Sequence, residues 1–170
     1  MEVFSSSNSP FSIVNHRLVG GGVIHVVCEK NRRGLGEPDM IILHYTGGTS
    51  AMSSAKFLAR SDVKASAHVV IGRDGQVIQL VPFNIEAWHA GKSSYGGRNE
   101  LNHCSIGIEL DNLGQLRLEE GKFVAECGRE VPVKEVYTED LGEVPTYWHD
   151  YTDVQMRVLN EVCGLLVDTY

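Results

Sequence analysis

Two short apolar segments, each carrying an ionisable residue at or near its end, constrain the fold of this 170-residue chain most. Residues 40–43 are followed directly by His44, and residues 105–110 contain Glu109. Runs of this length and composition predict buried strands. A titratable group on a buried strand is costly unless another group pairs with it. A metal ion with its bound water would supply that pairing, so the pattern points to metal-assisted hydrolysis.

The chain length suits a single domain, which we place at residues 1–170. Residues 1–22 are polar and then glycine-rich, and we expect a loosely held N-terminal arm there. The formal net charge of −7 argues against nucleic acid or an anionic membrane as a partner, because both attract a basic face. The N-terminus lacks the basic and apolar regions of an export signal, so we expect a cytoplasmic protein.

Cysteine and histidine spacing shows no local metal motif. None of the four cysteines lies in a CxxC pair, and we expect them to be reduced and partly buried. None of the seven histidines lies in an HxxxH or HExxH pattern. Any metal site must therefore be assembled from distant segments.

The order of elements predicts an α/β fold. Four segments have the composition of strands, namely residues 39–44, 67–71, 76–81 and 105–110. Residues 73–75 form a hairpin turn signal, which makes one strand pair antiparallel. Two segments, 50–60 and 152–166, have the composition or apolar spacing of helices, and Thr152 and Gln155 match a capping box at the start of the second. We expect a mixed central β-sheet flanked by helices.

Two long segments have weaker patterns. Residues 84–104 predict a long loop, and its aromatic residues favour a functional one. Residues 113–147 are charged, and we expect them to be irregular apart from a hairpin around residues 122–124 and 131–133.

Several motifs occur together in one order along the chain. They are Ile-Ile-Leu-His-Tyr-Thr at 41–46, Ser-Ala-His-Val-Val-Ile-Gly-Arg-Asp-Gly at 66–75, Ala-Trp-His-Ala-Gly at 87–91, Asn-His-Cys-Ser-Ile-Gly-Ile-Glu-Leu at 102–110, and the segment 147–155 with the helix after it. The chain resembles the type 2 N-acetylmuramoyl-L-alanine amidases over about residues 39–170. The resemblance implies their fold, which peptidoglycan recognition proteins share.

The resemblance implies a zinc-dependent hydrolase that cuts the amide bond between N-acetylmuramic acid and L-alanine in peptidoglycan or in recycled muropeptides. The family holds zinc with two histidines and an Asp or Cys. His44 matches the first zinc histidine, and Glu109 matches the general base. Physical chemistry agrees, because zinc with three protein ligands activates a bound water whose proton a nearby carboxylate can take.

Trp88, His89, Asn102 and Arg98 are candidate substrate-binding residues, because they lie in or beside the long loop. Trp88 offers a flat apolar face to a sugar or peptide, although a core position fits it equally well. His44 could instead be a core histidine bonded to backbone, and Glu109 a buried structural carboxylate. His68 is expected to have a packing role.

The chain departs from the family after the second helix. The family's second zinc histidine, third ligand and catalytic lysine follow that helix, so we expect a chain truncated relative to the family, with His44 as the one expected ligand. Such a chain should bind zinc weakly. The alternative function is a muropeptide-binding module without catalysis. A cysteine hydrolase using Cys104 beside His103 is disfavoured, because neighbours on a strand point to opposite faces.

Overall fold

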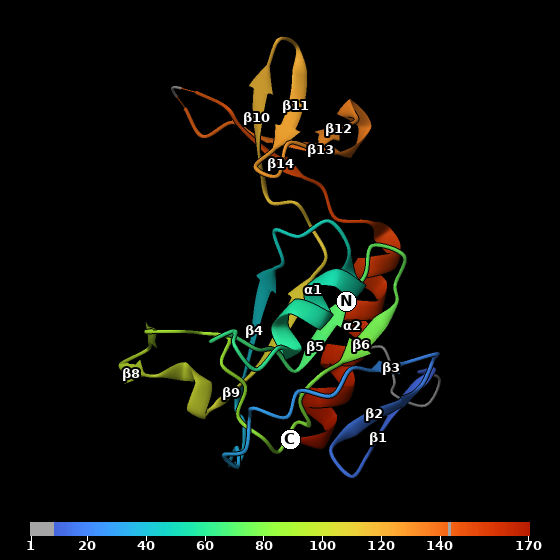
Figure 1. The fold of residues 1–170 in the computed structure, drawn as a ribbon, viewed down its shortest axis with the longest axis vertical. Helices are drawn as coiled ribbons and strands as arrows, with labels where there is room; N and C mark the ends of the chain where they lie inside the picture. The colour runs from blue at the N-terminus through green and yellow to red at the C-terminus, as the bar shows by residue number, and fades with distance from the viewer. Residues whose placement is uncertain (1–8, 143) are drawn as a thin grey trace.

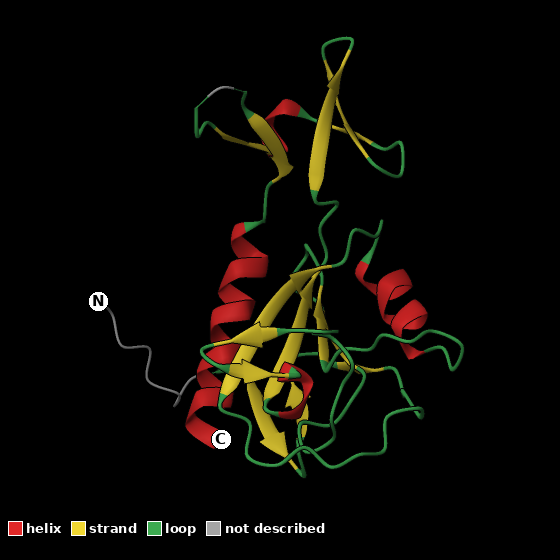
Figure 2. Cartoon of the chain, turned by 90° about the vertical axis from the view of Figure 1, so that its left-hand side faces the viewer, coloured by secondary structure: helices red, strands yellow, loops and turns green. Residues whose placement is uncertain are grey.

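The computed structural model describes residues 9–142 and 144–170. Its centre is a mixed five-stranded sheet in the order β3-β6-β5-β9-β4. The bounds are β3 Ile24–His25, β4 Met40–Tyr45, β5 Val69–Ile71, β6 Val77–Gln79 and β9 Ser105–Leu110. Neighbours β5, β9 and β4 are parallel, whereas β5 and β6 form the predicted antiparallel hairpin. The predicted mixed sheet is confirmed, with helices on its two faces (Figures 1 and 2).

Helices α1 (Ala51–Ala59) and α2 (Asp153–Thr169) cover opposite faces of this sheet. Alternate residues of a strand point to opposite faces, so on β5 Val70 packs with α1, whereas Val69 and Ile71 pack with α2. Thr152 caps α2 by accepting a bond from the Gln155 backbone N–H, as predicted. The Gln155 side chain departs from the capping box, because it donates to the carbonyls of Ile71 and Asp111.

The expected loose arm is wrong for its second half. Strands β1 (Phe11–Val14) and β2 (Arg17–Gly20) form an antiparallel hairpin that packs against the core. Leu18 is fully buried, and its N–H donates to Gln79 Oε1. Burial of these apolar side chains outweighs the flexibility of the nearby glycines. Residues 1–8 of the expected arm lie outside the described residues.

Residues 113–147 were expected to be irregular apart from one hairpin, and this was wrong for most of them. We call residues 113–149 the lobe. They form a second, antiparallel sheet in the order β12-β11-β10-β14-β13. The bounds are β10 Gln115–Glu119, β11 Lys122–Ala125, β12 Glu130–Val131, β13 Val136–Glu139 and β14 Thr146–His149. The hairpin expected near 122–133 is confirmed as β11 paired with β12. The lobe has its own small core, made by Leu113, Leu116, Ala125 and Val131 with Phe123 and Tyr147 packed against it.

The loop over residues 84–104 is largely irregular, as predicted. It contains a minimal hairpin, β7 (Ser94–Tyr95) with β8 (Arg98–Asn99), and a 3-10 turn at Leu101–His103. Among the described residues, no helix has the length and apolar character needed to cross a bilayer.

Candidate functional site

The structure places His44 and Glu109 beside each other on one face of the central sheet. Strands β4 and β9 are parallel neighbours, and their register pairs His44 with Glu109. Val70 of β5 continues the same row and packs with α1. Directly paired residues of neighbouring strands point to the same side of a sheet. Both side chains therefore lie on the α1 face, near the carboxyl ends of their strands.

The carboxyl group of Glu109 is set up to accept a proton near neutral pH. Burial raises its pKa from the usual range to about 7, because desolvation disfavours the carboxylate. A group whose pKa lies near the working pH is an effective general base. Glu109 beside His44 is thus suited to act as a general base, although burying its carboxylate destabilises the fold.

His44 Nε2 lies 3.0 Å from His89 Nδ1. Burial lowers the pKa of both rings, that of His89 to about 4, so both are neutral at pH 7. His89 Nε2 lies 3.4 Å from the carbonyl of Ser105 and 3.2 Å from its hydroxyl, which itself donates to Leu101. His89 Nε2 must then carry the proton, and His89 Nδ1 accepts from His44 Nε2–H. This leaves His44 Nδ1 as the free lone pair.

Gly107 makes the position of His89 possible. A Cβ at residue 107 would lie 2.2 Å from the His89 ring, so only glycine lets the imidazole rest on β9. Asn102 Oδ1 holds the loop from the other side by accepting from the N–H groups of His89 and Ala90, at 3.0 and 2.8 Å. The Asn102 carbonyl oxygen, expected to meet substrate, is therefore committed to the loop. The sequence analysis missed the contact between His44 and His89. The glycine at position 107 within a strand was the signal that could have indicated it, because such a glycine often marks a close approach of another group.

His68 has the packing role expected of it. The ring is fully buried, with Nδ1 accepting from the Gly107 N–H and Nε2 donating to the Ile85 carbonyl. Burial lowers the pKa of His68 to about 3, so the ring stays neutral. It fixes the backbone of β9 at the residue on which His89 rests.

The other predicted substrate-binding residues lie farther along the loop. Trp88 is 38% exposed, and its backbone N–H donates to Ser66 Oγ. Arg98 lies on β8, with its guanidinium 2.6 Å from the exposed Asp39 carboxylate. Within the described residues, neither side chain forms a hydrogen bond or an ion pair with His44 or Glu109.

The alternative cysteine hydrolase gains no geometric support. His103 Nδ1 lies 2.6 Å from Glu86 Oε2, and the Cys104 thiol donates to the Leu101 carbonyl. The two adjacent side chains thus have separate partners.

The donor set does not fit a complete zinc site. Over residues 9–142 and 144–170, no three His, Cys, Asp or Glu side chains are placed to hold a metal ion together. A catalytic zinc needs three protein ligands. His44 Nδ1 is a suitable single donor, but these residues supply no pair of donors to accompany it.

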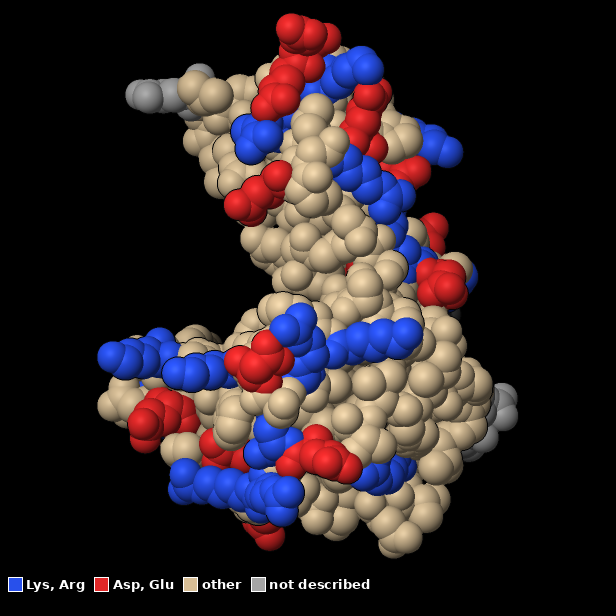
Figure 3. Space-filling view, viewed as in Figure 1, with Lys and Arg blue, Asp and Glu red and all other residues tan. Residues whose placement is uncertain are grey.

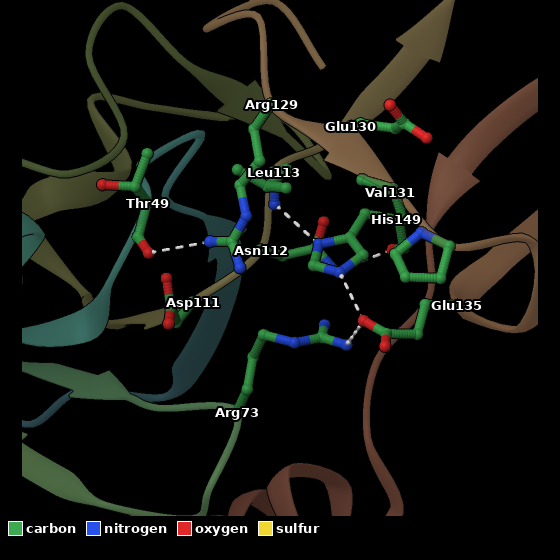
Figure 4. Close-up of a pocket in the computed structure, with 12 residues that line it drawn as sticks. Thr49, Arg73, Asp111, Asn112, Leu113, Arg129, Glu130, Val131, Glu135 and His149 are labelled. Atoms are coloured by element: carbon green, nitrogen blue, oxygen red, sulfur yellow. Dashed lines mark hydrogen bonds and ion pairs between the residues drawn. The ribbon is translucent and has the colours of Figure 1, made fainter. Parts of the chain in front are cut away.

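A polar network joins the lobe to the central body (Figure 4). Arg73 lies 3.3 Å from the Glu135 carboxylate, which is 3.6 Å from His149 Nε2. His149 Nδ1 accepts from the Leu113 N–H. Arg129 of the lobe donates to the Thr49 carbonyl of the body, on the loop after β4. Figure 3 shows a hollow between the lobe and the body.

Comparisons with known proteins agree on one family. The family model for N-acetylmuramoyl-L-alanine amidase matches residues 34–170. The 1,6-anhydro-N-acetylmuramyl-L-alanine amidase AmpD of Citrobacter freundii is 40% identical over 79 residues, which are 46% of this chain and 42% of that protein. The N-acetylmuramoyl-L-alanine amidase AmiD of Escherichia coli is 35% identical over 82 residues, which are 44% of this chain and 29% of that protein. The matched segments thus span less than half of these relatives.

Solved structures share the fold. The crystal structure of a selenomethionine derivative of AmpD has a TM-score of 0.53 at 26% identity, covering 88% of this chain and 76% of that one. Escherichia coli AmiD, in complex with anhydro-N-acetylmuramic acid-L-Ala-D-gamma-Glu-L-Lys, has a TM-score of 0.57 at 21% identity, covering 95% of this chain and 52% of that one. The second likeness speaks to the fold alone.

Proposed function

This chain belongs to the N-acetylmuramoyl-L-alanine amidase family, and we propose that it hydrolyses the amide bond between N-acetylmuramic acid and L-alanine in peptidoglycan fragments. The observation that carries the proposal is the pairing of His44 with Glu109 on one face, where burial raises the pKa of Glu109 to about 7. Relatives named as amidases, one of them for a 1,6-anhydro-N-acetylmuramyl substrate, support the same bond.

Glu109 is the general base in this proposal. Its carboxylate takes a proton from the attacking water as the new C–O bond forms at the amide carbonyl. The same proton then passes to the leaving nitrogen as the C–N bond breaks, which regenerates the carboxylate. The hydrogen bond from His44 to His89 holds the His44 ring beside this carboxylate, with Nδ1 free.

His44 is the one residue that we assign as a zinc ligand. The family resemblance implies zinc, and His44 Nδ1 is the donor we assign to it. Two further donors are needed, and residues 9–142 and 144–170 do not place them there. No step of the proposed reaction therefore passes through a metal ion.

A second candidate function is a muropeptide-binding module without hydrolysis. The incomplete donor set favours it. Mass spectrometry of an anhydro-N-acetylmuramyl tripeptide incubated with the 170-residue chain and added zinc separates the two. Hydrolysis is supported if the parent protein releases free tripeptide and the Glu109→Gln variant does not. Calorimetric binding that a chelator leaves intact, without release of tripeptide, supports the binding module and refutes hydrolysis.

We propose a soluble muropeptide as the substrate and the cytoplasm as the location. Turnover of the anhydromuropeptide with no release from intact cell-wall sacculi is the expected result. Equal release from sacculi would instead favour a wall-acting enzyme.

A further inference from the structure

A pocket of about 230 Å³ lies where the lobe meets the end of β4. Its aromatic walls come from Tyr45 of the body, Tyr137 and Trp148 of the lobe, and Tyr151 at the junction. Two carboxylates, those of Glu139 and Asp150, also line it. This pocket adjoins the polar junction of Figure 4, because Asn112 and His149 line both.

Strand register explains why these aromatic side chains converge. Tyr137 of β13 pairs directly with Trp148 of β14, so the two rings share one face of the lobe sheet. The neighbouring Tyr147 points to the other face, where it packs on Phe123 in the lobe core at a centroid distance of 4.9 Å. Tyr137 and Trp148 are therefore turned away from that core.

The body contributes the facing wall. The Tyr45 ring lies 6.4 Å from the Trp148 ring at an interplanar angle of 80°. Tyr45 also lies against Gly114, where a Cβ would approach the Tyr45 ring to 2.4 Å. The lobe backbone at Gly114 thus makes room for the Tyr45 ring in the wall of the pocket.

Much of this aromatic surface faces water. Tyr137 is 55% exposed, Tyr45 48% and Tyr151 38%. Exposed apolar surface gathered in one concave place marks a binding site more often than scattered exposed residues do. Tyrosine combines a flat apolar ring with a hydroxyl, which suits a ligand that has both apolar and hydroxylated faces.

We propose that this pocket binds an uncharged hexosamine ring of a glycan. The aromatic rings pack against the C–H faces of the sugar, and the carboxylates of Glu139 and Asp150 accept from its hydroxyls. One oxygen of each carboxylate is occupied, by Thr146 Oγ1 and by the Tyr151 N–H, which leaves the other oxygen for a ligand. The two negative charges oppose a stem peptide with free carboxylates, so charge favours the sugar.

The pocket lies across β4 from the proposed reaction site, because neighbouring residues of a strand point to opposite faces of the sheet. Tyr45 follows His44 directly, and its register partner Leu110 follows Glu109. β4 is an edge strand of the central sheet, so a bound chain can pass around its end from the pocket to the His44–Glu109 face. The link to peptidoglycan rests on the proposed function, whereas sugar binding itself does not.

The test uses tri-N-acetylchitotriose, which is uncharged and lacks the muramyl–alanine bond. Isothermal titration calorimetry compares the 170-residue protein with Tyr137→Ala and with Tyr95→Ala. Tyr95 is a matched control, because it is a 71% exposed tyrosine on β7, away from the pocket. We expect about tenfold weaker binding for Tyr137→Ala and unchanged binding for Tyr95→Ala. Near-UV circular dichroism and the melting temperature establish that both variants are folded.

Three results would overturn the proposal. The first is no binding of chitotriose to the parent protein up to about 10 mM, which is weaker than a specific subsite should be. The second is equal loss, or no loss, in the two variants. The third is binding of the tripeptide L-Ala-γ-D-Glu-L-Lys that Tyr137→Ala abolishes while chitotriose does not bind, which would assign the pocket to peptide. Failure of amide hydrolysis alone leaves the sugar assignment standing.

Discussion

Replacing Glu109 with Gln should stabilise the fold at alkaline pH and leave it unchanged at acid pH. Burial raises the pKa of the folded-state carboxyl to about 7, whereas an unfolded glutamate titrates at about 4.3. Between these values the folded state holds a proton that the unfolded state has released. Stability from this group is therefore fully present below pH 4 and is lost as pH rises through 7.

The magnitude follows from the difference in pKa. Each pKa unit corresponds to about 1.4 kcal/mol, so the parent should lose up to roughly 3 kcal/mol between pH 4 and pH 8 through this carboxyl alone. Glutamine resembles the protonated acid and does not titrate. The stability of Glu109→Gln minus that of the parent should thus grow from near zero at pH 4 to roughly 3 kcal/mol at pH 8.

Urea denaturation at several pH values, under reducing conditions because the described cysteines are free, measures this difference. Glu37→Gln is the matched control, since it removes the same charge from an exposed position. A constant difference across the pH range for Glu109→Gln, or the same pH-dependent rise in the control, would refute a buried carboxyl whose pKa lies near 7.

Three further predictions concern the histidine pair. Gly107→Ala should push the His89 ring off β9 and lower the free energy of unfolding by about 1–3 kcal/mol. The control Gly164→Ala, at a position in α2 where a Cβ meets nothing within 4 Å, should raise it by about 0.5–1 kcal/mol. Equal urea midpoints for the two variants would contradict the claim about Gly107. Asn102→Ala should cost about 1–3 kcal/mol because it removes the acceptor of two backbone bonds, and Asn102→Asp, which keeps that acceptor, should be nearly as stable as the parent. Excess zinc should leave the melting temperature of the chain within about 1 °C, because mass action stabilises only a fold with a formed site; a rise of several degrees that His44→Ala abolishes would disprove the incomplete donor set.

The central sheet could be predicted from the sequence because its strands are apolar and few residues long. The strands of parallel sheets have continuous apolar sequences, and those of β4 and β9 carry His44 and Glu109 at defined places. The predicted burial is confirmed for β9 but is wrong for β4, an edge strand whose residues are half-buried or exposed. If both segments are strands of one sheet, they need only be neighbouring strands for the His44 and Glu109 side chains to meet. The order of the family's motifs along the chain indicates that these two strands are neighbours.

The lobe and the histidine pair could not be predicted in the same way. In β10 every second residue is apolar, but the residues between, Arg117 and Glu119, are charged, and the buried surface of each strand is small. Such strands become stable only when all five strands of the lobe sheet pair and bury one shared core. The contact of His89 with His44 depends on how the loop over residues 84–104 returns over Gly107, which local sequence pattern does not encode.

The position of the lobe follows from where it leaves and rejoins the central sheet. It begins just after β9 and ends just before α2, and the Gln155 side chain binds the carbonyls of Ile71 and Asp111 at that point. The lobe is thereby held over the carboxyl ends of β4, β5 and β9, the edge at which sheets with parallel strands bind ligands. His44 and Glu109 lie at this same edge. A lobe anchored there can add binding surface to the proposed reaction site without disturbing the sheet that positions His44 and Glu109.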